Sequence, residues 1–177
     1  MGKSTFSGPV RSMAGFISQG PANVVNIPDG TNTLTLTVDD HAGRILTTND
    51  ASLTITLPAL NATADSASSG PGPQLDTDNN QSVEFFIFIE TSATAVKIGT
   101  NGTDKYVGSV LMVDTDSAGA TTGYAPGASN DFINFNGTTT GGIAGTWVRI
   151  TALKSLKWMV EGVVLGSGVV GTPFADS

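Results

Sequence analysis

The chain has 177 residues, of which 39% are hydrophobic and only 13% are charged, and it contains no cysteine. This length suits one β-rich domain, and the apolar fraction is sufficient for a packed core. The net charge of −7 and the lack of clustered Lys and Arg argue against nucleic-acid binding, because phosphate neutralisation needs such clusters. No run approaches the ~20 apolar residues of a membrane span, and the N-terminus lacks the apolar segment of a signal peptide. We therefore expect a soluble protein without a membrane partner, made in the cytoplasm.

Residues 1–30 differ from the rest of the chain. They mix Gly, Pro and Ser with isolated hydrophobic residues that follow neither a helical nor a strand period, and they carry two basic residues against one acid. A segment of this kind folds poorly by itself. It is either a disordered tail or an extended arm that becomes ordered on a partner surface. We favour the arm, whose docking residues would be Phe6, Val10 and Phe16.

Two segments alternate between threonine and aliphatic residues. Residues 33–38 place Leu34, Leu36 and Val38 on one side, and residues 53–57 repeat the pattern before a proline. Each segment predicts a half-buried strand with its threonines toward water.

The strongest strand signal is residues 83–89, VEFFIFI. Four apolar side chains fall on one face of such a strand, while Phe86 and Phe88 fall on the other. Large apolar groups on both faces predict a central strand that is covered on both sides.

Loops and turns divide the second half of the chain. Residues 61–80 and 114–130 are small, polar and rich in Gly, and both predict long exposed loops. Asn101-Gly102 is a typical hairpin turn, and Gly108 inside an apolar run suggests a β-bulge.

The last strong strand signals are residues 146–150 and 157–164, which indicate a hairpin with Trp147 and Trp158 near one another. Short strands between Gly, Asn and Pro turns predict an all-β fold, an antiparallel β-sandwich or barrel of jelly-roll type. The expected organisation along the chain is then an N-terminal arm, a β-sandwich domain and a C-terminal tail, with the bounds 1–30, 31–165 and 166–177.

Catalytic and metal-binding patterns are missing from the sequence. His41 is the only histidine and stands in a polar stretch, so we interpret it as a turn residue rather than a catalytic base. One His and no Cys cannot supply the usual zinc ligands. Residues 76–80 begin like a calcium loop but lack its turn Gly and closing Glu. We therefore expect no enzyme, no catalytic residue, no cofactor and no metal.

Residues 4–12, STFSGPVRS, followed by Gly15-Phe16, resemble the start of small virion proteins from T7-like marine tailed phages, including those that infect cyanobacteria. The later strand pattern is similar to many phage β-domains. The resemblance implies a decoration or cement protein on the capsid surface, assembled in the host cytoplasm, that binds the major capsid protein. We hypothesise that its β-domain forms a homotrimer at symmetry points of the capsid. The resemblance implies no catalytic position. The implied contact residues of the arm are Phe6, Pro9, Val10, Arg11 and Phe16.

A receptor-facing module is the alternative. A head- or tail-fibre β-domain could bind host glycans through exposed aromatic residues near the long loops, such as Tyr124 or Trp147. Against this alternative, the chain contains no coiled-coil or shaft segment that would carry a distal tip. An enzyme such as a small hydrolase ranks third.

Overall fold

The computed structural model describes residues 24–60, 80, 82–116, 120–154 and 156–177. These residues form twelve strands and one short helix. In chain order they are β1 (Val24–Ile27), β2 (Thr33–Thr35), α1 (Val38–His41), β3 (Ile45–Thr48), β4 (Thr54–Thr56), β5 (Glu84–Ile89), β6 (Val96–Gly99), β7 (Lys105–Asp114), β8 (Thr121–Tyr124), β9 (Phe132–Phe135), β10 (Trp147–Lys154), β11 (Lys157–Gly166) and β12 (Phe174–Ala175).

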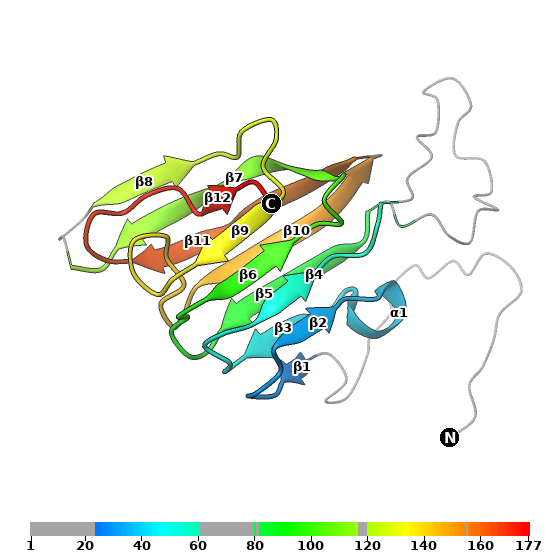
Figure 1. The fold of residues 1–177 in the computed structure, drawn as a ribbon, viewed down its shortest axis with the longest axis horizontal. Coiled ribbons are helices and arrows are strands. Elements are labelled where there is room, and N and C mark those ends of the chain that lie inside the picture. The colour runs from blue at the N-terminus through cyan, green and yellow to red at the C-terminus, as the bar shows by residue number, and fades with distance from the viewer. Residues whose placement is uncertain (1–23, 61–79, 81, 117–119, 155) are drawn as a thin grey trace, which may run out of the picture.

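The strands build two sheets that pack face to face, which confirms the predicted all-β sandwich. The large sheet has seven strands in the order β1-β3-β5-β10-β11-β7-β8, and the small sheet has five in the order β12-β9-β6-β4-β2. In Figure 1 the small sheet overlies the large one, and β1 lies at one edge of the sandwich.

The first six strands wind as a coil between the two sheets. Odd-numbered strands enter the large sheet and even-numbered strands the small one, so β1, β3 and β5 pair in parallel, as do β2, β4 and β6. Each turn of the coil returns the chain to the same sheet in the same direction. The sheets are therefore mixed, whereas the sequence predicted purely antiparallel sheets. Antiparallel pairing dominates the second half, where β10 joins β5 to β11.

The core lies between the sheets. Its largest fully buried side chains are Trp158, Tyr106, Phe85 and Phe135. The Phe85 and Trp158 rings lie 6.0 Å apart between centroids. Burial, and next the negative charge of Asp131, raise the pKa of Tyr106, so its hydroxyl stays protonated and donates to the Ile98 carbonyl at 3.2 Å.

Strand β5 is central, as predicted, because it pairs with β3 on one side and β10 on the other. Phe85, Ile87 and Ile89 are completely buried in the core. Phe86 and Phe88 point out of the sandwich and are only partly buried. The expected cover over this second face is not supplied by either described sheet, because both are used in forming the one core.

A helical turn replaces the end of the predicted strand 33–38. Leu36 is buried as expected, but Val38 begins α1 and is 37% exposed. The Thr37 side chain caps the helix by accepting from the Asp40 amide, a preference that outweighs the alternation. His41 ends the same turn, where its Nδ1 accepts from the Thr37 amide at 3.0 Å, a local structural role.

Short edge strands occupy two segments that were expected to lie outside the sandwich. β1 starts at Val24, within the range predicted as an arm, and β12 falls within the predicted tail. Phe174 of β12 is 5% exposed, and its ring centroid is 6.4 Å from that of Tyr106. Two to four residues are too few to show a strand period, and partners remote in sequence hold these strands in place.

The predicted loop 114–130 contains β8, which pairs antiparallel with β7. The Thr and Tyr residues of β8 favour a strand, but the Gly, Ser and Ala residues around them made the whole segment look like a loop. The predicted loop 61–80 lies outside the described residues except for Asn80. The side-chain amide Nδ2 of Asn80 donates to the Ala59 carbonyl at 2.8 Å.

Two further predictions about turns are corrected. Asn101-Gly102 does form a turn, but the turn connects β6 in the small sheet with β7 in the large one, so it is not a hairpin. Gly108 is not a bulge, because the pairing of β7 with β11 runs through it without a shift. Its φ of +103° and the Val160 carbonyl oxygen, which a Cβ at this position would overlap, explain the glycine.

The C-terminal hairpin of β10 and β11 is confirmed, but its tryptophans lie on opposite faces. Trp158 pairs with Ala152, and Trp147 pairs with Val163. Position 147 is five residues from 152, and an odd separation along a strand reverses the face. Trp158 is therefore in the core and Trp147 on the outside.

Candidate functional site

The outward side of the large sheet is rich in apolar side chains, which lie among polar ones such as Thr47 and Thr151, and we call it the apolar face. Three of its residues are strongly exposed for hydrophobic side chains: Val24 at 50%, Leu111 at 45% and Ile45 at 43%. Alternation along each strand places aromatic and aliphatic residues beside them. The apolar members of the face are Val24, Ile45, Phe86, Phe88, Trp147, Met159, Val163, Val107, Leu111 and Val113.

The strand register arranges these side chains in rows that cross the sheet. One row runs from Phe88 on β5 through Trp147 on β10 and Val163 on β11 to Leu111 on β7. Phe86 lies next to this row, and its ring stacks on that of Trp147 with centroids 5.4 Å apart and planes 10° apart. The stacked rings form an ordered aromatic platform at the middle of the face.

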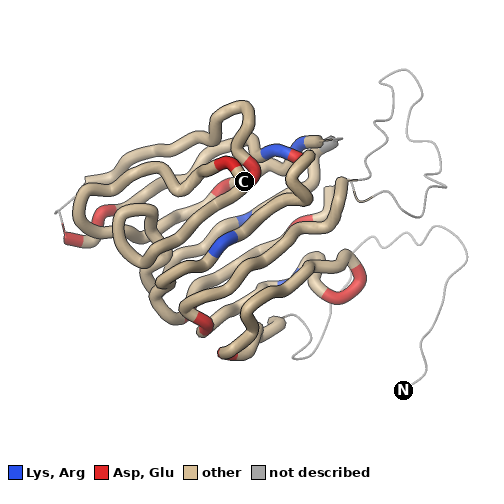
Figure 2. The backbone as a smooth tube through the Cα atoms, viewed as in Figure 1, with Lys and Arg blue, Asp and Glu red and all other residues tan. Residues whose placement is uncertain are grey.

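The outward side of the small sheet has the opposite character. One of its rows carries Thr33, Thr54, Lys97 and Asn134 on neighbouring strands. This polar face matches the expectation that the threonines of the alternating strands point to water. Figure 2 shows that acidic positions gather mainly in loops and at strand ends. One outer side of the sandwich is thus polar and the other is rich in apolar side chains, and large exposed apolar patches typically mark interaction sites.

One ionic row crosses the apolar face. Arg149 Nη1 lies 3.2 Å from Glu161 Oε1, and Arg149 Nε lies 3.5 Å from Glu84 Oε1. All three side chains are 42–50% exposed, so each pair contributes less than about 1 kcal/mol to stability. Lys157 at the start of β11 pairs in register with Lys105 and Lys154, so this face does not share the acidic excess of the whole chain.

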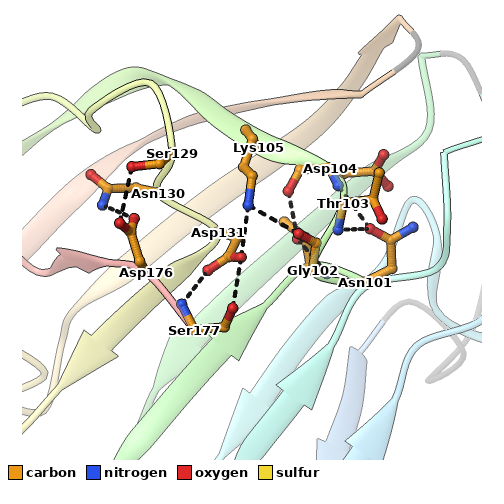
Figure 3. Close-up of polar contacts among 11 residues, drawn as sticks. Asn101, Gly102, Thr103, Asp104, Lys105, Ser129, Asn130, Asp131, Asp176 and Ser177 are labelled. Atoms are coloured by element: carbon orange, nitrogen blue, oxygen red, sulfur yellow. Dashed lines mark hydrogen bonds and ion pairs between the residues drawn. The ribbon is translucent and has the colours of Figure 1, made fainter.

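A second polar cluster lies at one end of the sandwich (Figure 3). The Lys105 ammonium lies 2.8 Å from Asp131 Oδ2, and Ser177 donates to Asp131 through its amide at 2.8 Å and its hydroxyl at 3.1 Å. Burial of the Asp131 side chain opposes its ionisation, but the hydrogen bonds from Lys105 and Ser177 outweigh burial and lower its pKa. Both carboxylate oxygens are engaged, so the cluster has a structural role: it ties β7 to the segment before β9.

Replacing Lys105 with methionine should lower the free energy of unfolding by about 3 kcal/mol at pH 7, because the buried Asp131 charge loses its partner. The lowered pKa means that ionised Asp131 stabilises the native fold above its unfolded pKa of ~3.9, and that this contribution is lost as pH falls through the lower folded value. The effect of the substitution should therefore shrink in urea titrations at pH 3. Replacement of the exposed Lys97 with methionine is the control, and a pH-independent loss at position 105 would contradict the prediction.

Among the described residues, no three His, Cys, Asp and Glu side chains lie close enough to hold a metal ion. None of the described helices has the length and hydrophobicity to cross a membrane. Tyr124, proposed above as a sugar-stacking residue, is partly buried and donates its hydroxyl to the Val170 carbonyl at 2.9 Å.

The predicted contact residues of the arm all lie outside the described residues: Phe6, Pro9, Val10, Arg11 and Phe16. Sequence reasoning missed the apolar face, although the second side of β5 contained the signal. Phe86 and Phe88 were expected to be covered within the domain, whereas they lie on its surface. Trp147 and Val163 on the hairpin lie on the same outward face as Phe86 and Phe88.

Comparison with known proteins adds no relative: the sequence matches no family model, no curated protein and no solved structure. The two unlike outer faces of the sandwich are therefore the main structural guide to function. The resemblance of residues 4–12 to phage virion proteins stays an expectation from the sequence.

Proposed function

We propose that this protein is a virion structural protein, a capsid decoration or cement protein that binds the major capsid lattice and stabilises a phage head. The observation that supports the proposal is the apolar face, a surface suited to association with other protein subunits, as a component of a repeating shell needs. The resemblance of residues 4–12 to phage virion proteins supplies the phage context.

Such a role needs rigid shape and repeated contacts rather than catalysis. Two packed sheets supply the rigidity. On an icosahedral lattice, symmetry multiplies a modest interface into a large stabilisation, because bound copies are held at high effective concentration. In this proposal the protein is not an enzyme, and it acts as a homo-oligomer, in our hypothesis a trimer, on the capsid surface after assembly in the host cytoplasm.

The N-terminal segment is the proposed capsid-binding element. It joins the sandwich at Val24, at the edge of the large sheet, so it can extend away from the domain toward a neighbouring subunit. In the proposal its hydrophobic residues dock onto the major capsid protein, and Arg11 adds a positive charge to a chain that is otherwise acidic.

Deletion of residues 2–20 should abolish binding to undecorated capsids and leave the fold intact, because the described sandwich begins at Val24. Co-sedimentation of full-length and truncated protein with empty capsids of the same phage would measure binding, and circular dichroism would check the fold. Normal capsid occupancy by the folded truncated protein would refute the role of the arm.

Glycan binding is the second candidate, and the Phe86–Trp147 platform is the observation that favours it. Aromatic rings on a surface can stack on sugar rings, and Arg149 and Glu161 lie close by in the same register. Saturable binding of the purified protein to host cells, lost in the variant Trp147→Ala, would favour this candidate over the capsid.

A further inference from the structure

We infer that the apolar face is the surface through which copies of this chain associate. The inference rests on the proposed function, in which the protein acts as an oligomer, and it names the interface that holds the oligomer together. Three properties of the face point to a second copy as the occupant: its size, its charge and its regular rows of side chains.

The size of the face matches a specific interface. Seven strands at ~4.8 Å spacing give a width of ~29 Å, and four outward residues at ~6.8 Å spacing, as on β10, give a length of ~20 Å. Strands β1, β3 and β8 are shorter, so the whole width of the face is needed to contribute roughly 600 Å² from each copy, or ~1,200 Å² in total, the lower limit for stable specific complexes. A contact confined to one edge of the sheet would fall short of that limit.

The charge of the face also suits self-association. The whole chain carries a net charge of −7, and identical copies repel one another wherever this charge is concentrated. On the apolar face Arg149 stands between Glu84 and Glu161, while Lys157 pairs in register with Lys154 and with Lys105, which contacts Asp131. This face therefore does not concentrate the negative charge of the chain, and a rotated copy can present Glu161 to Arg149 across the interface.

The regular rows make the face complementary to itself. Sheets pack face to face at ~10 Å through interdigitating side chains, and every copy supplies the same rows of Phe88, Trp147 and Val163. Two copies can stack as a second sandwich, while three can surround a threefold axis with the face of each copy turned inward. Both arrangements bury the Phe86–Trp147 platform.

The test is the mass of the full-length protein in solution, without capsids, by light scattering and sedimentation equilibrium. The wild-type protein should show a multiple of 18.0 kDa. Leu111→Lys and Ile45→Lys place a charge at exposed positions of the face, so the fold should be retained while association weakens roughly 30-fold or more. Thr33→Lys, on the polar face, is the matched control and should keep the wild-type mass.

Three results would overturn the inference. One is a wild-type protein that is monomeric at every concentration, and another is wild-type mass in both folded lysine variants. The third is a monomer that begins to associate only when residues 2–20 are deleted, because the N-terminal segment would then be the occupant. Capsid co-sedimentation is scored separately: a protein that oligomerises through the face but ignores capsids supports the inference and refutes the proposed function.

Discussion

Replacing Trp158 with alanine should lower the free energy of unfolding by about 3–5 kcal/mol, the usual loss when a buried aromatic residue is truncated. Trp158 is completely buried, and it is among the largest side chains between the sheets. It packs against Phe85 at 6.0 Å between ring centroids and so links β11 to the central strand β5. The cavity left by the indole would lie where the two sheets meet, and neighbouring strands would hold it open.

Trp147 is the matched control, because the same substitution removes the same side chain from the opposite face of the hairpin. Trp147→Ala should cost less than half as much as Trp158→Ala, since its ring is partly exposed and loses mainly the stacking on Phe86. Urea unfolding at a concentration where all variants are monomeric would compare them. Equal losses at the two positions would contradict the assigned faces.

Alanine at position 108 should destabilise the protein by about 3 kcal/mol or more. Gly108 has a φ of +103°, which is strained for any residue with a Cβ. An added Cβ would also overlap the Val160 carbonyl oxygen, a backbone atom held in the ladder between β7 and β11. Because neither strand can move without breaking that ladder, strain and overlap add to one another.

Gly123 in β8 provides the control for this substitution. A Cβ at position 123 would meet nothing within 4 Å, and the residue has no positive φ. Gly123→Ala should change the free energy of unfolding by less than about 1 kcal/mol, with a gain expected from the reduced entropy of the unfolded chain. If urea midpoints showed G108A to be as stable as G123A, the tight pairing at Gly108 would be wrong.

The sequence pattern correctly predicted the features of the fold that depend on consecutive residues. Alternation predicted the strand around residues 53–57, and apolar residues on both sides of 83–89 predicted that β5 is central. The terminal hairpin followed from two strong strand signals around a short turn. These features depend on side-chain parity and turn chemistry, which are written in consecutive residues.

What the sequence did not reveal depends on partners far away in the chain. Parallel pairing of β1, β3 and β5 requires three segments that are separated by whole turns of the coil. The short strand β12 forms by pairing with the edge of β9, and β8 forms by pairing with the edge of β7. The apolar face was missed for a different reason. Alternation along a strand shows which side chains share a face, but it does not show whether that face is covered or exposed, so Phe86 and Phe88 were assigned to a covered layer.

The coil of the first six strands gives the sandwich a natural unit of growth. Because each turn adds one strand to each sheet, insertion of one further turn between β2 and β3 would widen both sheets together by ~4.8 Å and leave the second half of the chain unchanged. The coil can thus gain whole turns and keep both the buried hydrophobic core and the rows of outward side chains. In this architecture the width of the outer faces can therefore change in steps of one strand, while the existing core stays the same.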